Sequence, residues 1–129
     1  MENQSEEMVK SQCDLKFHEF MAQIGDLSIV YHMIKMEDSL YVWVGNYNDN
    51  TMNDLSFAIK SPYEKEPVTT KIMGSIFNDC SSNLAKRLSK KLSMPVYISF
   101  NIFNLNNLSL LLIEKRLRDE LNLHPDFLI

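Results

Sequence analysis

The stretch Asp38-Ser39-Leu40-Tyr41-Val42-Trp43-Val44-Gly45 decides the fold. A short polar turn over residues 37–39 leads into an apolar segment over residues 40–44. Successive side chains of a strand point to opposite faces, and here both faces are apolar, with Trp43 on one and Val44 on the other. A strand of this kind is expected to be covered on both faces. Trp43 is then a core or interface anchor without a chemical role.

Alternating apolar and polar residues predict more strands on either side of this stretch. Before it, one strand begins at Leu15 and ends at the Gly25-Asp26 turn, and a second covers residues 27–36. After it, an asparagine-rich segment over residues 46–54 is typical of an exposed loop. A strand over residues 55–59 and an edge-like strand over residues 68–73 follow.

The period changes to that of a helix over residues 79–93, where leucines recur every four residues. Asp79, Ser81 or Ser82 can cap its first free amides. Residues 96–103 then alternate as a clear amphipathic strand. Residues 108–113 are expected to form a closing strand that passes into a helix over residues 114–123, with Glu114 and Arg118 as an i,i+4 ion pair.

This order of elements predicts an α+β domain. Its sheet, or sandwich, is expected to be mostly antiparallel, with six to seven strands, one helix between strands and one C-terminal helix. Residues 1–13 are acidic and polar, which is typical of a flexible tail. Residues 14–129 are long enough for a single core, since a chain of 129 residues buries roughly two-thirds of its unfolded surface on folding.

Composition excludes several classes of function. The 17 acidic residues outnumber the 13 basic ones, for a net charge of -4, which argues against a nucleic-acid partner. No apolar run is long enough to cross a membrane, so no membrane partner is expected. The two cysteines, Cys13 and Cys80, form no disulfide framework. A cytoplasmic location is therefore expected, and a nuclear one is compatible with the same features.

The sequence offers no recognisable catalytic, cofactor or metal site. The three glycines stand alone, so no glycine-rich loop can hold a phosphate. His18 and His32 lie on neighbouring expected strands and could face each other, but a structural or exposed role is favoured over metal binding. Cys80 lies near a helix start, where its pKa could fall, yet without a partner histidine an inert thiol is favoured. We therefore expect no enzyme and no cofactor.

The candidate binding residues are basic and aromatic. Four cations share the middle helix, where they either face solvent or dock an acidic partner. Aromatic residues and methionines are abundant, and they serve either the core or an interface. The apolar segments 96–103 and 108–112 are the candidate interface. The candidate protein-binding residues are Lys86, Arg87, Lys90, Lys91, Tyr97, Phe100 and Phe103.

The opening stretch resembles the strand motif of the proteasome assembly chaperone 4 family, in which an acidic-serine turn leads into an apolar strand ending Trp-Val-Gly. Further likenesses follow in the family's order, and together they span about residues 17–125. They are Ser61, Tyr63, Pro67, Val68 and Thr70; Leu84-Ala85, Arg87-Leu88 and Lys91; Val96, Ser99 and Asn101; and Glu114, Arg116, Leu117, Glu120 and Leu121. The acidic tail and the loop over residues 46–53 depart from the pattern.

The resemblance implies a non-catalytic chaperone that pairs with proteasome assembly chaperone 3 as a heterodimer and helps to assemble the α-ring of the 20S proteasome. Other assembly chaperones carry a C-terminal hydrophobic-tyrosine-any motif. This chain ends Phe127-Leu128-Ile129, with leucine in place of tyrosine, so that docking mode is not expected. The alternative is a small ligand-binding regulatory domain or an enzyme without short motifs, which would need a concave pocket with converging polar groups.

Overall fold

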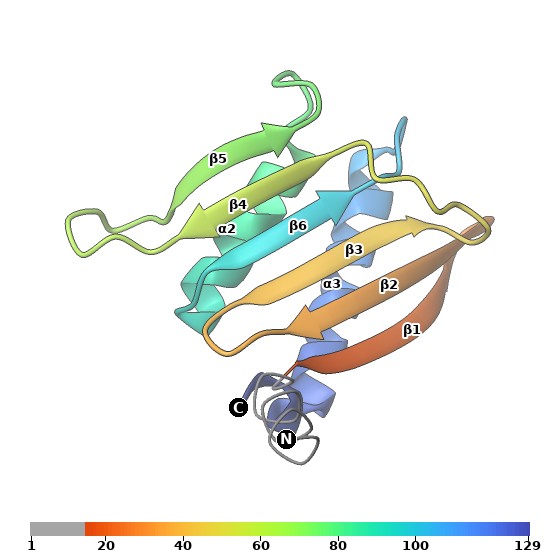
Figure 1. Ribbon diagram of the computed structural model, residues 1–129. Helices are drawn as coiled ribbons and strands as arrows, with labels where there is room; N and C mark the ends of the chain where they lie inside the picture. Colours follow the sequence, from red (N-terminus) through yellow and green to blue (C-terminus); the bar gives the residue numbers. More distant parts are fainter. Residues whose placement is uncertain (1–14) are drawn as a thin grey trace, which may run out of the picture.

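The computed structural model describes residues 15–129, so the tail expected over residues 1–13, with Cys13, lies outside the described residues. The described part forms six strands and two α-helices (Figure 1). In chain order they are β1 (Lys16–Ile24), β2 (Leu27–Lys35), β3 (Leu40–Asn46), β4 (Leu55–Ile59), β5 (Val68–Met73), α2 (Cys80–Leu92), β6 (Val96–Phe100) and α3 (Asn107–Leu123), followed by the short 3-10 helix η1 (Pro125–Leu128).

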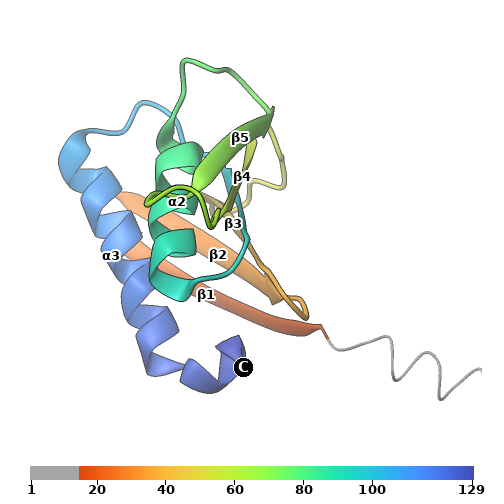
Figure 2. The same ribbon diagram turned by 90° about the vertical axis from the view of Figure 1, so that its left-hand side faces the viewer.

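The strands form one sheet in the order β1-β2-β3-β6-β4-β5. All neighbouring pairs are antiparallel except β3 and β6, which are parallel. This confirms the expected α+β class and the mostly antiparallel sheet. Helices α2 and α3 both lie on one face of the sheet (Figure 2). Within residues 15–129 neither helix covers the opposite face, on which Trp43 of β3 is buried and Tyr41 is partly exposed.

The core lies between the sheet and the helices. Every second residue of β2 and β3 points inward, as their alternation predicts. Tyr31 lies wholly inside, and its hydroxyl donates a hydrogen bond to the carbonyl oxygen of Ile113 at 2.9 Å. Burial raises the pKa of Tyr31 above its ordinary value. The phenol therefore stays protonated and ties β2 to α3. The other buried residues of the hydrophobic core include Ile29, Met33, Leu40, Val42, Val44, Leu84, Leu88, Val96, Ile98, Leu117 and Leu121.

Residues 108–113 are helical, so the expected closing strand is wrong. Helix α3 begins at Asn107, and the side chain of Asn106 accepts a hydrogen bond from the amide of Ser109 at 2.7 Å. This N-cap satisfies an amide that a helix start leaves free. A short apolar run suits a strand and a buried helix equally well, and here the cap decides in favour of the helix. No helix within residues 15–129 is long and apolar enough to cross a membrane.

Strand β4 turns its small residues toward the helices. Ser56 and Ala58 are fully buried, whereas Phe57 points to the other face and Ile59 is exposed. Small side chains let α2 approach closely, and the hydroxyl oxygen of Ser56 lies 2.7 Å from that of Ser81 and 2.9 Å from that of Ser82. Hydrophobicity alone would have assigned the two faces the other way.

The start of α2 differs from the expected cap. Asp79 occupies the N-cap position without a side-chain hydrogen bond to the helix. The side chain of Asn78 instead accepts a weak hydrogen bond from the amide of Cys80 at 3.3 Å. Ser81 and Ser82 are therefore free to bind β4, which fixes the helix on the sheet.

The loop over residues 46–54 is exposed along most of its length but ends on a buried residue. Asp54 is 2% exposed, and its side chain pairs with Lys71 on β5. Its backbone carbonyl oxygen accepts a hydrogen bond from the hydroxyl of Ser99 at 2.6 Å. Asn101 adds a further link, because its side-chain oxygen accepts from the amide of Asn53 at 2.8 Å. These contacts anchor the end of the loop to β5 and β6.

Candidate protein-binding surfaces

The face of the sheet away from the helices is largely apolar, with Glu19 and His32 as an ion pair on it, and we call it the outer sheet face. Residues that lie opposite each other in the strand register share a face. Phe17 pairs with Ile34, which pairs with Tyr41, which in turn pairs with Tyr97. Phe17 is 69% exposed. Further apolar residues of this face are Met21, Val30, Trp43, Phe57, Ile59 and Val68.

The outer sheet face is slightly hollowed at the end where β2 turns into β3. Ile34, Met36, Ser39, Tyr41 and Tyr97 line this apolar hollow. Burial raises the pKa of Tyr41, and a hydrogen bond with the side chain of Ser99 partly offsets that rise. No charged side chain is among the lining residues, so the hollow suits an apolar protein surface better than a polar small molecule.

Trp43 lies on this face and holds the following loop. Its indole nitrogen donates a hydrogen bond to the carbonyl oxygen of Thr51 at 3.1 Å, and its ring centroid lies 5.3 Å from that of His32. A Cβ at Gly45 would lie only 2.2 Å from the indole. The Trp-Val-Gly sequence is thus a packing unit, in which the glycine leaves room for the ring. Trp43 is 8% exposed, so it packs beneath the exposed side chains of the outer sheet face and offers little surface of its own.

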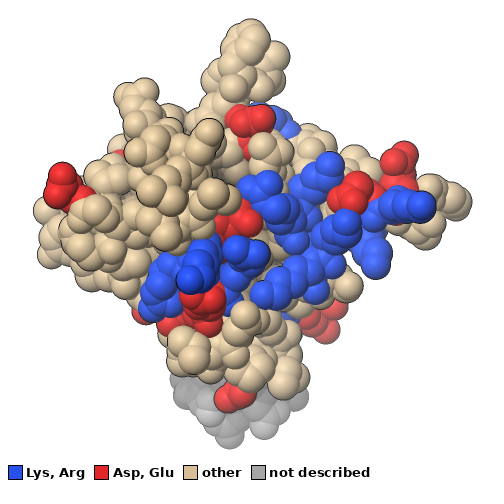
Figure 3. Space-filling view, turned by 180° about the vertical axis from the view of Figure 1, so that it is seen from behind, with Lys and Arg blue, Asp and Glu red and all other residues tan. Residues whose placement is uncertain are grey.

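The four cations of α2 lie on the helix-bearing face, which shows a band of basic side chains interspersed with acidic ones (Figure 3). Arg87 forms a bidentate pair with Glu114 of α3, with its Nε 2.8 and 3.0 Å from the two carboxylate oxygens. Glu114 therefore pairs across the helices, and the expected pair with Arg118 is wrong. Two lysines of α2 also have polar partners. Lys90 forms an ion pair with Glu66 at 2.6 Å, and Lys91 donates a hydrogen bond to the side-chain oxygen of Asn122 at 3.1 Å.

The seven candidate binding residues do not form one surface. Lys86, Arg87, Lys90 and Lys91 lie on the helix side, whereas Tyr97 lies on the outer sheet face. Phe100 is 2% exposed and belongs to the core, so it is corrected from an interface residue to a packing residue. Phe103 is exposed just beyond the end of β6.

A second surface with exposed apolar side chains lies at the end of the molecule where α2 and α3 begin. Phe77 is 93% exposed, and together with Phe103 and Leu105 it lines a shallow hollow that also has the polar residues Asn78, Asp79 and Asn104 in its lining. We call Phe77, Phe103 and Leu105 the apolar end patch. Phe103 is thus the one predicted aromatic residue that the structure places on this second surface.

Sequence reasoning missed the contribution of β1 and β2 to the outer sheet face. Phe17, Met21 and Ile34 are apolar residues of two predicted strands, and the register brings them beside Tyr41 and Tyr97. The available signal was that β2 carries apolar residues on both of its sides. The strand order, which places β2 next to β3, is needed to show that these residues join Tyr41 and Tyr97 on the outer sheet face.

The structure separates the other candidate groups, His18, His32 and Cys80. His18 and His32 do not face each other, because His18 lies opposite Met33 and points to the helix side, while His32 pairs with Glu19 at 3.3 Å. Burial raises the pKa of Cys80, and the nearby charges of Asp79 and Asp54 add to the rise. A raised pKa lowers the thiolate fraction of Cys80 at neutral pH.

The chain is similar to several known proteins. The family model of proteasome assembly chaperone 4 matches residues 28–102. Mouse proteasome assembly chaperone 4 is 31% identical over 121 residues, which cover 94% of this chain and 97% of the mouse protein. The human protein of the same name is 31% identical over 113 residues, covering 88% of this chain and 90% of the human protein.

A solved structure shares the fold. It is described as a chaperone complex for yeast 20S proteasome assembly, and one of its chains superposes with a TM-score of 0.63 at 12% identity, covering 89% of this chain and 98% of that chain. At this identity the likeness concerns the fold alone. The family match and the mammalian relatives settle membership: this chain belongs to the proteasome assembly chaperone 4 family.

Proposed function

We propose that this protein is a non-catalytic chaperone of 20S proteasome assembly, which forms a heterodimer with proteasome assembly chaperone 3 and acts on the α-ring. The observation that carries the proposal is the apolar outer sheet face, which neither helix covers. Family membership supports the chaperone role, since the mouse and human relatives bear the name proteasome assembly chaperone 4. We propose the cytoplasm and nucleus as its location.

The outer sheet face has the properties of a protein interface. Aromatic residues are enriched in such interfaces, and here Phe17, Tyr41, Phe57 and Tyr97 lie across neighbouring strands. Apolar patches larger than a few hundred Å² are rare on proteins that stay monomeric, and such patches mark interaction sites. A partner with a similar open sheet could pack against it face to face, at a spacing of about 10 Å between sheets. The helices of both chains would then point outward.

This arrangement leaves the helix side for α-ring subunits. The basic band of α2 and the apolar end patch both remain accessible when the outer sheet face is covered. We propose that these surfaces contact α-subunits. Reversing charge at Lys86 and Lys91 should weaken capture of α-subunits more at low salt than at high salt, because salt screens exposed charges. Equal capture by the reversed variant at low salt would contradict a role for the band.

The test of the heterodimer uses the full chain co-purified with proteasome assembly chaperone 3. The double variant Phe17→Lys/Ile34→Lys places two charges on neighbouring positions of the outer sheet face. Leu111→Lys is the matched control, since Leu111 is an exposed apolar residue of α3. Size-exclusion chromatography with light scattering should show a one-to-one complex for the wild type and the control, and its loss in the double variant.

Melting temperatures of the isolated chains distinguish a lost interface from a lost fold. The double variant should melt near the wild type, because Phe17 is exposed and Ile34 is only partly covered. A complex that survives the double variant but not Leu111→Lys would place the interface on the helix side. That result would contradict the proposal for the outer sheet face.

A further inference from the structure

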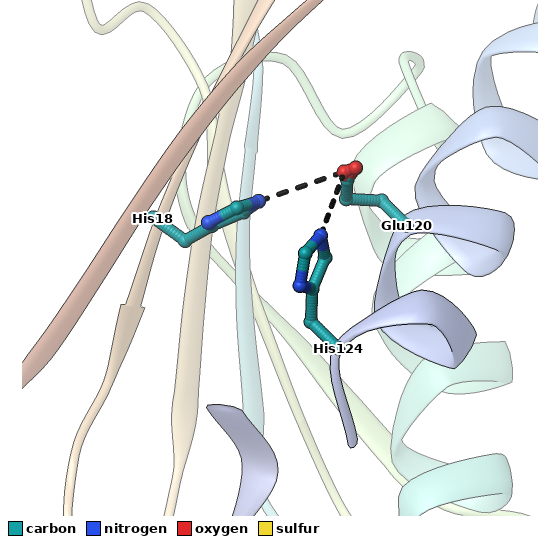
Figure 4. Close-up of side chains that lie close together, drawn as sticks. All are labelled: His18, Glu120 and His124. Carbon is teal, nitrogen blue, oxygen red and sulfur yellow. Dashed lines mark ion pairs between the residues drawn. The ribbon is translucent and has the colours of Figure 1, made fainter. Parts of the chain in front are cut away.

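Three side chains with metal-binding atoms meet where β1 crosses the end of α3. His18 comes from β1, and Glu120 and His124 come from the last turn of α3 and its C-cap, one helical turn apart (Figure 4). The Nε2 atoms of His18 and His124 lie 3.5 and 3.7 Å from the same oxygen, Oε2 of Glu120. The three candidate ligand atoms all lie within 4.8 Å of one another.

Two of these three separations are close to those of a tetrahedral metal site. Zinc binds imidazole nitrogen and carboxylate oxygen at about 2.0–2.2 Å, which puts neighbouring ligand atoms of a tetrahedron roughly 3.3–3.6 Å apart. The two distances to Glu120 are close to this range. The side chain of His124 is 49% exposed, so it can rotate to bring the two imidazole nitrogens closer.

The surroundings orient the carboxylate toward the histidines. Oε1 of Glu120 accepts a hydrogen bond from Arg116 at 3.3 Å, which leaves Oε2 to face both imidazoles. A neighbour that holds a ligand in this way is typical of metal sites. The positive charge of Arg116 opposes a cation, and its guanidinium is held to one side over the ring of Phe20, 4.7 Å from the ring centroid.

His18 supplies an independent observation. Its Nε2 is shielded from solvent and makes no hydrogen bond within residues 15–129; the Glu120 carboxylate at 3.5 Å is an ion-pair partner only when the imidazole is protonated. Burying a polar atom without a partner costs free energy, so the arrangement favours a ligand that would use this nitrogen. The rings of Phe20 and Phe127 both lie 5.8 Å from the imidazole and hold it in place.

We propose that His18, Glu120 and His124 bind one divalent ion of the zinc class, with water as the fourth ligand. Two imidazoles and one carboxylate form a ligand set that zinc accepts. The ion would join the edge strand β1 to the end of α3, two elements far apart in the sequence. It would therefore stabilise the folded chain, since a ligand that binds only the folded state raises its stability. This site is independent of the proposed chaperone function.

The test measures Zn²⁺ binding to the full chain after treatment with a chelator. His124→Gln is the main variant, because His124 lies at the surface, and His18→Gln is the second. His32→Gln is the matched control, since His32 is the remaining histidine and points to the outer sheet face. A Cys13→Ser/Cys80→Ser background removes both thiols as competing ligands.

Isothermal titration should give one Zn²⁺ per chain for the background and for His32→Gln, with a rise in melting temperature on binding. His124→Gln and His18→Gln should each weaken binding by more than about tenfold. Co²⁺ should give the visible absorption of a four-coordinate nitrogen and oxygen site in the background protein and in His32→Gln. His124→Gln and His18→Gln should not show this absorption. Absence of stoichiometric Zn²⁺ binding, or equal affinity in the background and in a folded His124→Gln variant, would overturn the proposal.

Discussion

Replacing Gly45 with alanine is expected to displace the indole of Trp43. The new Cβ would lie 2.2 Å from the nearest ring carbon and within 2.8 Å of two more. Two carbon atoms that are not bonded to each other cannot lie this close, so the ring must move. The side chain would then lose its hydrogen bond to Thr51 and part of its packing on the outer sheet face.

The expected loss of stability is about 1–3 kcal/mol, the usual cost of forcing extra atoms into a packed site. At roughly 3–6 °C per kcal/mol for a domain of this size, the melting temperature should fall by about 3–18 °C. Alanine itself is the better strand residue by about 0.5–1 kcal/mol. The clash with Trp43, and not the backbone of Gly45, is therefore the source of the loss.

Fluorescence reports the displacement directly, because Trp43 is the single tryptophan of the chain and is buried. Its emission should shift to longer wavelength in Gly45→Ala as the ring meets water. In a Trp43→Leu background, the same Gly45→Ala change should cost little or be slightly stabilising. An unchanged emission and melting temperature in Gly45→Ala, or an equal loss in both backgrounds, would refute the packing unit.

The remaining predictions concern the charge pair and the thiol. Arg87→Met should lower the free energy of unfolding by about 1–2 kcal/mol in thermal denaturation, because it leaves the largely buried carboxylate of Glu114 without its bidentate partner. Arg118→Met should change the free energy of unfolding little. A larger loss in Arg118→Met than in Arg87→Met would contradict the pairing of Arg87 with Glu114. In a Cys13→Ser background, Cys80 should be alkylated more slowly than a free cysteine at pH 8.5, since its raised pKa lowers the thiolate fraction. A faster reaction would show that the thiol is activated.

Strand positions could be predicted where the alternation was local and strong. The edge strand over residues 68–73 and the strand over residues 55–59 have the predicted bounds in the structure. The alternation over residues 55–59, and Pro67 and Gly74 on either side of residues 68–73, carry enough information. Which face of β4 points inward could not be read, because that depends on how closely α2 approaches Ser56 and Ala58.

The binding surfaces were only partly predictable, because they depend on strand order. The alternation along β6 puts Tyr97 and Phe100 on opposite faces, but it does not show which of the two faces the helices cover. The parallel pairing of β3 with β6 places Tyr97 beside Tyr41, and no local pattern indicates such a distant pairing. Arg87 shows the same limit, since its partner Glu114 lies on another helix 27 residues away.

The meeting of His18 with Glu120 and His124 is also a product of the tertiary structure. Glu120 and His124 have the i,i+4 spacing that places them on one helix face, which a sequence can show. His18 reaches them from a strand about a hundred residues earlier, where sequence reasoning paired it with His32 instead. The strand register reverses that expectation by turning the two histidines to opposite sides of the sheet.

Affinity capture of the tagged full chain from cells tests the assembly-chaperone role most directly. Mass spectrometry of the captured material should identify proteasome assembly chaperone 3 together with α-ring subunits. The variant Phe17→Lys/Ile34→Lys should lose the chaperone partner, while Leu111→Lys should keep it. Capture of neither the chaperone partner nor any α-subunit by the wild-type chain would contradict the proposed function.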